Sequence, residues 1–253
     1  MTEAATKYQV LQKVLQKIGQ NPFAALIGPQ RVLRWSGLQA LWKVYRDIPE
    51  DGSDFAASML SNLDITINMA TGSVGDIPDC GPLIIVANHP TGGAEGLVAL
   101  SILCKRRNDL QLLGNRLLSY IPEIAYRQFS VGTDNDARRS MLAAARHLRN
   151  GGAVLVFPAG TVAHWQLGRG YAEAPWHPSI ARLASITGAA VLPLYFSAKT
   201  SLRWRILSAV SKLARTALLP LELLAQQGRT IDVDVGKKLV SADEIAQYFR
   251  DRA

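Results

Sequence analysis

The stretch Leu83-Ile-Ile-Val-Ala-Asn-His-Pro-Thr-Gly-Gly-Ala-Glu-Gly96 decides the fold of this chain. Its apolar part, Leu83–Ala87, predicts a buried strand, and its glycine-rich part predicts a turn that leads into a helix over Glu95–Lys105. Side chains at such strand ends are exposed while the sheet keeps their backbone rigid, which suits catalytic groups. The turn carries His89, and a histidine beside the carboxylate of Glu95 can act as a general base. The same residues also fit a purely structural role, in which His89 belongs to the turn and Glu95 stabilises the first turn of the helix.

Short apolar runs alternate with helical patterns over most of the chain. The predicted strands are Leu83–Ala87, Leu110–Leu113, Ala153–Phe157, Val191–Phe196 and Thr230–Val235, and the predicted helices are Glu95–Lys105, Asp136–Asn150 and Pro178–Thr187. This alternation indicates an α/β fold with a mixed central sheet that is covered by helices. The stretch Ser241-Ala-Asp-Glu244 fits a capping box that opens a last short helix.

The first part of the chain is expected to be helical. Apolar residues recur at helical spacing in two stretches, at Leu11, Val14, Leu15 and Ile18 and at Phe55, Met59, Leu63 and Ile67. The stretch Asp76–Pro82 contains two prolines and a glycine and ends this pattern. We therefore expect a helical segment over residues 1–75 that packs on an α/β domain over residues 76–253.

The composition excludes several classes of protein. With 253 residues, of which 48% are hydrophobic, the chain can bury a large core, so general disorder is excluded. Two cysteines and four histidines are too few for a disulfide framework or a four-cysteine zinc site, and we expect no metal. The sequence has no window of 18 uninterrupted apolar residues and no signal-peptide pattern, so it predicts neither a transmembrane helix nor secretion.

The formal net charge of +8 indicates an anionic partner. On a helix over Arg203–Leu219, the side chains of Arg205, Lys212 and Arg215 would form a basic face opposite apolar residues, with Trp204 at the border. Such a helix suits the surface of an anionic membrane, so we expect a peripheral protein on the cytoplasmic face. A helix that merely covers the sheet fits equally well. Nucleic-acid binding is disfavoured, because no nucleic-acid-binding module is recognisable.

Six blocks of the sequence follow one another in the order of a known family. They are His89-Pro-Thr-Gly-Gly-Ala-Glu95, Arg116-Leu-Leu-Ser-Tyr-Ile-Pro122, Phe157-Pro-Ala-Gly-Thr161, Ala174–Ala184, Val191-Leu-Pro-Leu-Tyr195 and Gly228–Gly236. Together these blocks resemble the glycerolipid and lysophospholipid acyltransferase family, in its bacterial hemolysin-like branch. The resemblance implies an acyltransferase-like α/β fold.

The resemblance also implies a reaction, the transfer of a fatty acyl group from an acyl thioester to a lysolipid-type acceptor in membrane lipid synthesis. His89 is then the general base and Glu95 its partner, while the acceptor itself is the nucleophile. Backbone N–H groups around Gly92–Gly93 or Gly160–Thr161 are candidates for binding the thioester oxygen. Acyl-CoA or acyl carrier protein is the implied co-substrate, with no other cofactor. The implied substrate-binding residues are Thr91, Asn115, Arg116, Gly160 and Thr161.

The sequence departs from the family pattern in three places. Ala159 stands where many members have Glu, Val162 stands where they have Arg, and the Arg usual near Phe129–Asp136 is not visible. Those groups help to hold a glycerol phosphate in related enzymes. A lone Arg116 suits a monoanionic or zwitterionic acceptor, so we favour a lysophospholipid or a lyso-aminolipid over glycerol phosphate. The alternative is a non-catalytic lipid-binding module of acyltransferase-like fold.

Overall fold

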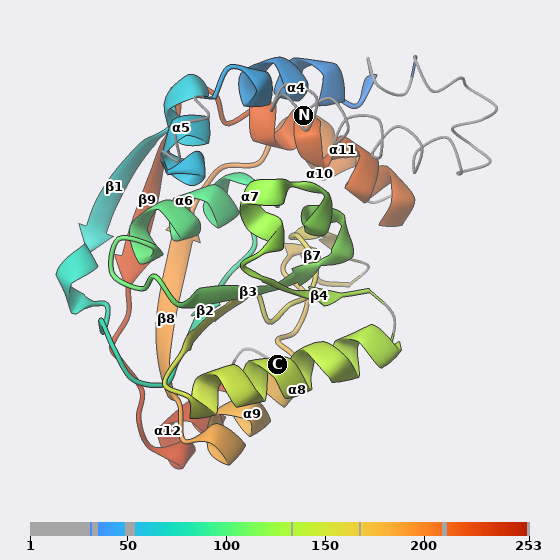
Figure 1. Cartoon of the computed structure of the whole chain (residues 1–253). Helices are drawn as coiled ribbons and strands as arrows, with labels where there is room; N and C mark the ends of the chain where they lie inside the picture. Colours follow the sequence, from blue (N-terminus) through green and yellow to red (C-terminus); the bar gives the residue numbers. More distant parts are fainter. Residues whose placement is uncertain are drawn as a thin grey trace.

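The computed structural model describes residues 31, 35–48, 54–132, 134–166, 168–208 and 212–251 (Figure 1). Its helices are α4 (Leu38–Arg46), α5 (Phe55–Asn62), α6 (Ala94–Leu103), α7 (Pro122–Ala125), α8 (Asp134–Arg149), α9 (Ser179–Thr187), α10 (Leu202–Leu207), α11 (Lys212–Leu224) and α12 (Ala242–Arg250), with 3₁₀ helices η1 (Val74–Asp76) and η2 (Arg116–Tyr120). Its strands are β1 (Thr66–Thr71), β2 (Leu83–Ala87), β3 (Leu110–Asn115), β4 (Gln128–Val131), β5 (Ala153–Val156), β6 (His164–Gln166), β7 (Gly170–Ala172), β8 (Ala190–Ser197) and β9 (Thr230–Val235).

The main sheet of the described residues has seven strands in the order β1-β9-β8-β2-β5-β3-β4. β2 pairs in parallel with β5 and β8, and β3 pairs in parallel with β5 and β4. β9 runs antiparallel to β8 and parallel to β1. The mixed central sheet predicted from the sequence is therefore confirmed. β2, β3, β4, β5 and β8 all end at one edge, with β2 in the middle of the sheet.

Helices cover both faces of this sheet. α4, α5, α6 and α11 pack on one face, and α8, α9 and α12 pack on the other (Figure 1). In β2, Leu83, Ile85 and Ala87 belong to the first core, while Ile84 and Val86 belong to the second. All of β2 is buried. Burial on both faces explains why this strand is an unbroken apolar run rather than an alternating one.

The predicted strands at β2, β3, β5, β8 and β9 are confirmed, as are the predicted helices at α6, α8 and α9. Their ends shift by at most two residues. The predicted capping box is also present, because the Ser241 side chain accepts the Glu244 N–H at 3.1 Å and the Glu244 side chain accepts the Ser241 N–H. This box begins α12, which covers the second face of the sheet.

The expected helical segment over residues 1–75 is not helical at its end. After α5, Asp64 has a φ of 51° and turns the chain out of the helix. Thr66–Thr71 forms β1 instead, at the edge of the main sheet beside β9. Ile67 and Met69 are the half-buried side chains of this strand, too few to distinguish it from a helix by period. The division at residue 75 stays a prediction, and the expected helix around Leu11–Ile18 lies outside the described residues.

The expected single helix over Arg203–Leu219 is also wrong. The chain forms α10 and α11 instead, and Ser201 begins α10 by accepting the Trp204 N–H at 3.1 Å. α10 turns Trp204 into the protein interior, where 1% of its surface is exposed. A straight amphipathic helix would have kept this side chain at the border of its two faces. Among the described residues, no helix is both long and apolar enough to cross a bilayer.

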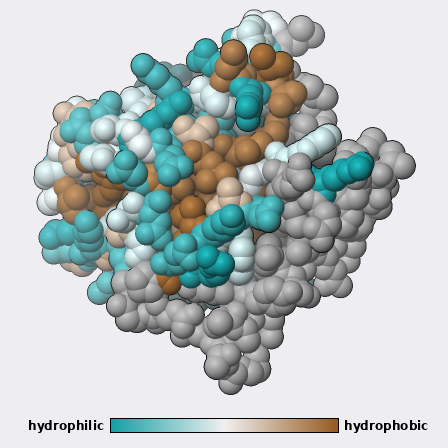
Figure 2. Space-filling model, turned by 90° about the horizontal axis from the view of Figure 1, so that it is seen from above, coloured by the Kyte–Doolittle hydropathy of each residue, from teal (hydrophilic) through white to brown (hydrophobic). Residues whose placement is uncertain are grey.

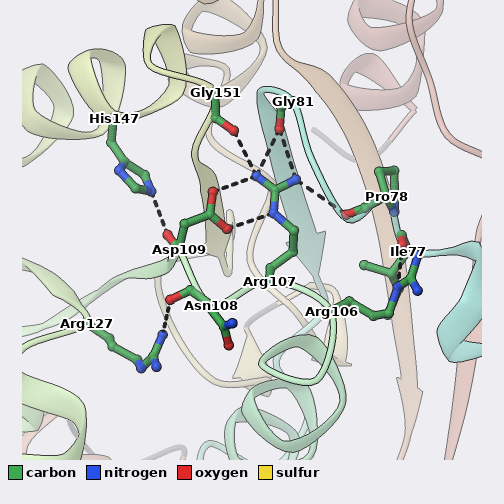
Figure 3. Close-up of polar contacts among 10 residues, drawn as sticks. All are labelled: Ile77, Pro78, Gly81, Arg106, Arg107, Asn108, Asp109, Arg127, His147 and Gly151. Carbon is green, nitrogen blue, oxygen red and sulfur yellow. Dashed lines mark hydrogen bonds and ion pairs between the residues drawn. The ribbon is translucent and has the colours of Figure 1, made fainter.

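Arg107 connects the amino-terminal ends of three neighbouring strands through hydrogen bonds. It is 1% exposed, and its guanidinium donates at 2.9 Å to the carbonyls of Gly81 and Gly151, which lie just before β2 and β5 (Figure 3). It also donates to both carboxylate oxygens of Asp109, just before β3, at 2.8 and 2.9 Å. At the edge of the sheet opposite the His89 turn, one side chain thus connects the segments that precede β2, β5 and β3.

We expect Arg107→Ala to lower the free energy of unfolding by about 3 kcal/mol, because buried carbonyls lose a charged donor. Urea unfolding at neutral pH, followed by circular dichroism, measures this loss. The hydrogen bond from Arg107 holds the pKa of Asp109 below its usual value. The stabilisation that this pair contributes is present above the ordinary aspartate pKa and is lost as the pH falls through the lowered one. The difference from wild type should therefore narrow in acid.

Arg106→Ala is the matched control. This neighbouring arginine lies nearer the surface, with a 3.3 Å hydrogen bond to the Ile77 carbonyl and a 3.5 Å ion pair with Asp79. Exposed pairs contribute little, so we expect a loss under about 1 kcal/mol. Equal losses for the two variants would contradict the role assigned to Arg107.

Candidate active site

The turn after β2 lies at the carboxyl edge of the sheet, between the ends of β5 and β8. Asn88, the first residue of this turn, continues the pairing of β2 with β8 through its side chain. Its amide donates to the Phe196 carbonyl at 2.9 Å and accepts the Phe196 N–H at 2.7 Å. This paired amide fixes where the turn begins and hence where His89 leaves the sheet.

The structure brings His89 and Glu95 together. Nδ1 of His89 lies 2.9 Å from Oε1 of Glu95, in the first turn of α6. The two atoms approach closely, although they do not form a well-aligned hydrogen bond. The His89 ring stacks on Phe157, the residue after β5, with 4.3 Å between ring centroids. With 19% of its side chain exposed, the ring is held on two sides and open on another.

Glu95 is fully buried, and the turn supplies its hydrogen bonds. Its Oε1 accepts the N–H groups of Thr91 and Gly92 at 2.9 and 2.7 Å, and its Oε2 accepts the Thr91 hydroxyl. Burial alone would raise the pKa of Glu95, but His89 and these donors together lower it. Glu95 is therefore an ionised carboxylate next to the imidazole.

Gly92 is required by the packing above this turn. Its φ is +89°, and a Cβ there would lie 2.3 Å from Leu219 Cδ2 and 2.8 Å from Val162 Cγ2. Any side chain would collide with both α11 and the segment after β5. Val162, which stands where the resemblance led us to expect an arginine, is buried against the His89 turn. Close packing from two elements holds the turn in the shape that places its N–H groups on Glu95.

Two of the predicted substrate-binding residues lie beside His89. Gly160 and Thr161 belong to the turn after β5, and the Ala163 N–H donates to the His89 carbonyl at 2.9 Å. The Thr161 hydroxyl oxygen is buried with no hydrogen-bond partner among the described residues. The N–H of Gly160 is already donated to the Phe157 carbonyl at 3.0 Å. Thr161 therefore remains as a candidate for substrate contact.

The other three predicted substrate-binding residues differ in position. Thr91 is fully buried and donates to Glu95, so its assignment to substrate is wrong. Asn115 caps η2 by accepting the Leu117 N–H at 2.9 Å. Arg116 is exposed at the carboxyl end of β3, one strand beyond β5. It shares the edge of the sheet with His89 but does not adjoin it.

The predicted membrane-contacting residues are only partly at the surface. Trp204 is buried and donates its indole N–H to the Ala163 carbonyl at 2.8 Å, so its assignment to a membrane is wrong. Arg205 is exposed and lies over the Tyr171 ring, 5.0 Å from its centroid. Arg215 is half-buried and donates to the Ser208 carbonyl at 3.1 Å, at the end of α10. The side chain of Lys212 lies outside the described residues.

Glu173 is a site residue that the sequence reading missed. Its Oε1 accepts the His89 backbone N–H at 2.6 Å, across 84 positions of sequence. No local pattern marks this residue, because it follows the short β6–β7 hairpin, which was not predicted either.

The described residues include no group of three or more His, Cys, Asp or Glu that could hold a metal ion.

The known proteins that resemble this chain are acyltransferases. A family model described as an acyltransferase matches residues 30–250. Lyso-glycine lipid O-acyltransferase of Phocaeicola vulgatus is 24% identical over 196 residues, which are 74% of this chain and 69% of that protein. The crystal structure of 1-acyl-sn-glycerophosphate (LPA) acyltransferase, PlsC, from Thermotoga maritima aligns with a TM-score of 0.47 and 16% identity, over 97% of this chain and 93% of that one. Since the family model spans nearly all of the chain and includes the His89 turn, this protein belongs to the acyltransferase family.

Proposed function

We propose that this acyltransferase moves a fatty acyl group from an acyl thioester, carried by coenzyme A or acyl carrier protein, to a hydroxyl of a lysolipid. The observation that carries the proposal is the 2.9 Å approach of His89 Nδ1 to the buried carboxylate of Glu95. The name of the Phocaeicola vulgatus relative supports both the lysolipid acceptor and transfer to oxygen.

The proposed mechanism follows from which ring nitrogen faces Glu95. With Nδ1 toward the carboxylate, Nε2 of His89 takes the proton of the acceptor hydroxyl, and Glu95 stabilises the imidazolium. The acceptor oxygen attacks the thioester carbonyl, and the tetrahedral intermediate then collapses and expels the thiolate. The imidazolium returns its proton to this thiolate, which leaves a free thiol and the new ester. No protein side chain is acylated.

The thioester oxygen needs a donor when it gains negative charge. The N–H groups of Gly92 and Gly160 are already committed, to Glu95 at 2.7 Å and to Phe157 at 3.0 Å. The Thr161 hydroxyl is buried without a partner among the described residues, one residue before the buried Val162. The N–H groups of Gly93 and Thr161 and the Thr161 hydroxyl therefore remain the proposed donors to this oxygen.

We propose a monoanionic or zwitterionic acceptor, with a lyso-aminolipid favoured. Val162 lies buried against the turn where many relatives carry a cation, which leaves Arg116 as the candidate contact for an anionic headgroup. A dianionic phosphomonoester would be undercompensated by one guanidinium. The relative that acts, by its name, on a lyso-glycine lipid is consistent with this choice.

We also propose peripheral attachment to an anionic membrane through α10 and the β6–β7 hairpin. Leu202, Ile206 and Trp165 are 73%, 61% and 53% exposed, and the cations Arg203 and Arg205 lie among them. α10 and α11 also border an apolar hollow of about 330 Å³. Figure 2 shows the side of the molecule on which α4 and α11 lie, where apolar side chains gather between hydrophilic ones. Exposed apolar and basic groups side by side suit a charged lipid surface.

His89→Ala should lower the rate of acyl transfer by about two to four orders of magnitude, because the base is removed. Glu95→Gln should also be severe, since the imidazolium loses its counter-charge. Release of free thiol from an acyl thioester, with product lipids identified by mass spectrometry, measures the rate. His177→Ala is the matched control, because His177 is exposed and its ring forms a hydrogen bond with Ser179. Near-normal turnover in His89→Ala would contradict the assignment of His89 as the base, whereas the absence of turnover in the wild type would favour the lipid-binding alternative.

Arg116→Ala should raise the KM for the acceptor about tenfold and leave the KM for the thioester unchanged, because one charge-assisted contact in the ground state is lost. Steady-state kinetics with a lyso-aminolipid, a lysophospholipid and glycerol 3-phosphate measure both constants. Arg182→Ala, at another exposed arginine, should change neither. Glycerol 3-phosphate as the best acceptor would contradict the proposed specificity.

Changing Arg203 and Arg205 together to Gln should weaken binding to phosphatidylglycerol vesicles by about 2 kcal/mol, or roughly thirtyfold, if each contributes about 1 kcal/mol near a charged surface. Vesicle co-sedimentation at low and high salt measures this change. The control changes Arg146 and Arg149 together to Gln, at two exposed positions of α8 on the other face of the sheet. Equal weakening by the two double variants would show that net charge alone matters.

A further inference from the structure

The backbone of His89 is held on both sides by the β6–β7 hairpin. Its carbonyl accepts the Ala163 N–H at 2.9 Å, and its N–H donates to the Glu173 carboxylate at 2.6 Å. Ala163 precedes β6 and Glu173 follows β7, directly beside the paired residues His164 and Ala172. The two ends of the hairpin therefore hold one residue of the turn, His89, between them.

The Glu173 carboxylate is itself fixed by the core. Its second oxygen accepts the indole N–H of Trp176 at 3.0 Å, and Trp176 is 5% exposed among the side chains that pack under α9 and α12. Each oxygen thus accepts one N–H. Burial raises the pKa of Glu173 above its usual value, and the two N–H donors oppose this shift only in part.

The hairpin is also anchored on the side away from His89. The Trp204 indole donates to the Ala163 carbonyl at 2.8 Å, and Arg205 lies over the Tyr171 ring at 5.0 Å. Ala163 therefore donates its N–H to His89 and accepts a hydrogen bond from α10 at its carbonyl. Because the hairpin is fixed from α10, from the core and at the turn, it can define the position of the His89 backbone.

We propose that Glu173 is a positioning residue for His89, and this inference rests on the proposed function, in which His89 is the base. The turn at His89 lies beyond the end of β2 and has no sheet partner of its own, so its N–H depends on the Glu173 carboxylate. A displaced backbone would move the ring relative to Glu95 and the acceptor. Misplacement by about 1 Å can cost about a hundredfold in rate.

Glu173→Gln tests the role in catalysis. A glutamine has one acceptor oxygen and one NH₂ group, so one of the two N–H donors must face another donor. We expect kcat to fall between about ten- and a hundredfold with both KM values within about twofold, since the binding residues are untouched. Glu244→Gln, at the exposed α12 cap, is the control and should keep wild-type kcat. Unchanged kcat in folded Glu173→Gln would overturn the proposal.

A spectroscopic readout needs no substrate. Labelling with ¹⁵N-histidine gives four backbone amide signals, because the chain has four histidines, and His89→Ala identifies the one from His89. A short N–H bond to a carboxylate shifts an amide proton downfield, so this signal should move upfield in Glu173→Gln while the other three stay. If it does not move, the contact is absent and the proposal is overturned.

Two further outcomes separate the inference from the proposed function. If Glu173→Gln fails to fold, Glu173→Asp keeps the charge but shortens the side chain, and an upfield shift with intermediate kcat supports the proposal. If the His89 signal moves as expected but the wild type transfers no acyl group to any lysolipid, the hydrogen bond stands. The proposed function then fails, and the catalytic role of Glu173 fails with it.

Discussion

The burial of the Glu95 carboxylate constrains everything around it. A buried charge is costly unless it is compensated, and here the compensation comes from His89 and from two backbone N–H groups of the turn, at 2.9 and 2.7 Å. Those N–H groups converge only because Gly92 adopts a φ of +89°. The absence of a side chain at Gly92 in turn lets Val162 and Leu219 pack against the turn. α11 therefore packs through Leu219 on the same turn that compensates the charge of Glu95.

The parallel centre of the sheet brings the remaining parts of the site together. β2, β5 and β3 end at the same edge, so the turns that follow them lie side by side although they are far apart in sequence. The turns after β2 and β5 supply His89, the proposed base, and Phe157, the ring on which it stacks. β3 leads to Arg116 one strand further away, so the end of β5 lies between His89 and this cation. At the opposite edge Arg107 holds the amino-terminal ends of the same three strands together. Because the strands are paired along their length, this also fixes the relative positions of their carboxyl ends.

The sequence was informative where the physical cause is local. The apolar run of β2 and the His89–Glu95 spacing both lie within 14 residues, and their structure follows from burial and helix geometry. β1 was mistaken for helix because two half-buried side chains, Ile67 and Met69, do not define a period. Trp204 was placed at a surface because the pattern could not show that the helix ends at Leu207. Glu173 was missed because its contact with His89 spans 84 positions and depends on tertiary structure alone.

The β6–β7 hairpin links the proposed membrane-facing helix to the proposed base. Ala163 accepts a hydrogen bond from Trp204 of α10 and donates one to His89, so a single residue links the two. The exposed residues Leu202 and Ile206 belong to the same short helix as the buried Trp204. A helix of six residues cannot shift its apolar side without also moving its tryptophan. If α10 docks on lipid as proposed, the base is therefore held at a fixed position relative to the surface from which a lysolipid must come.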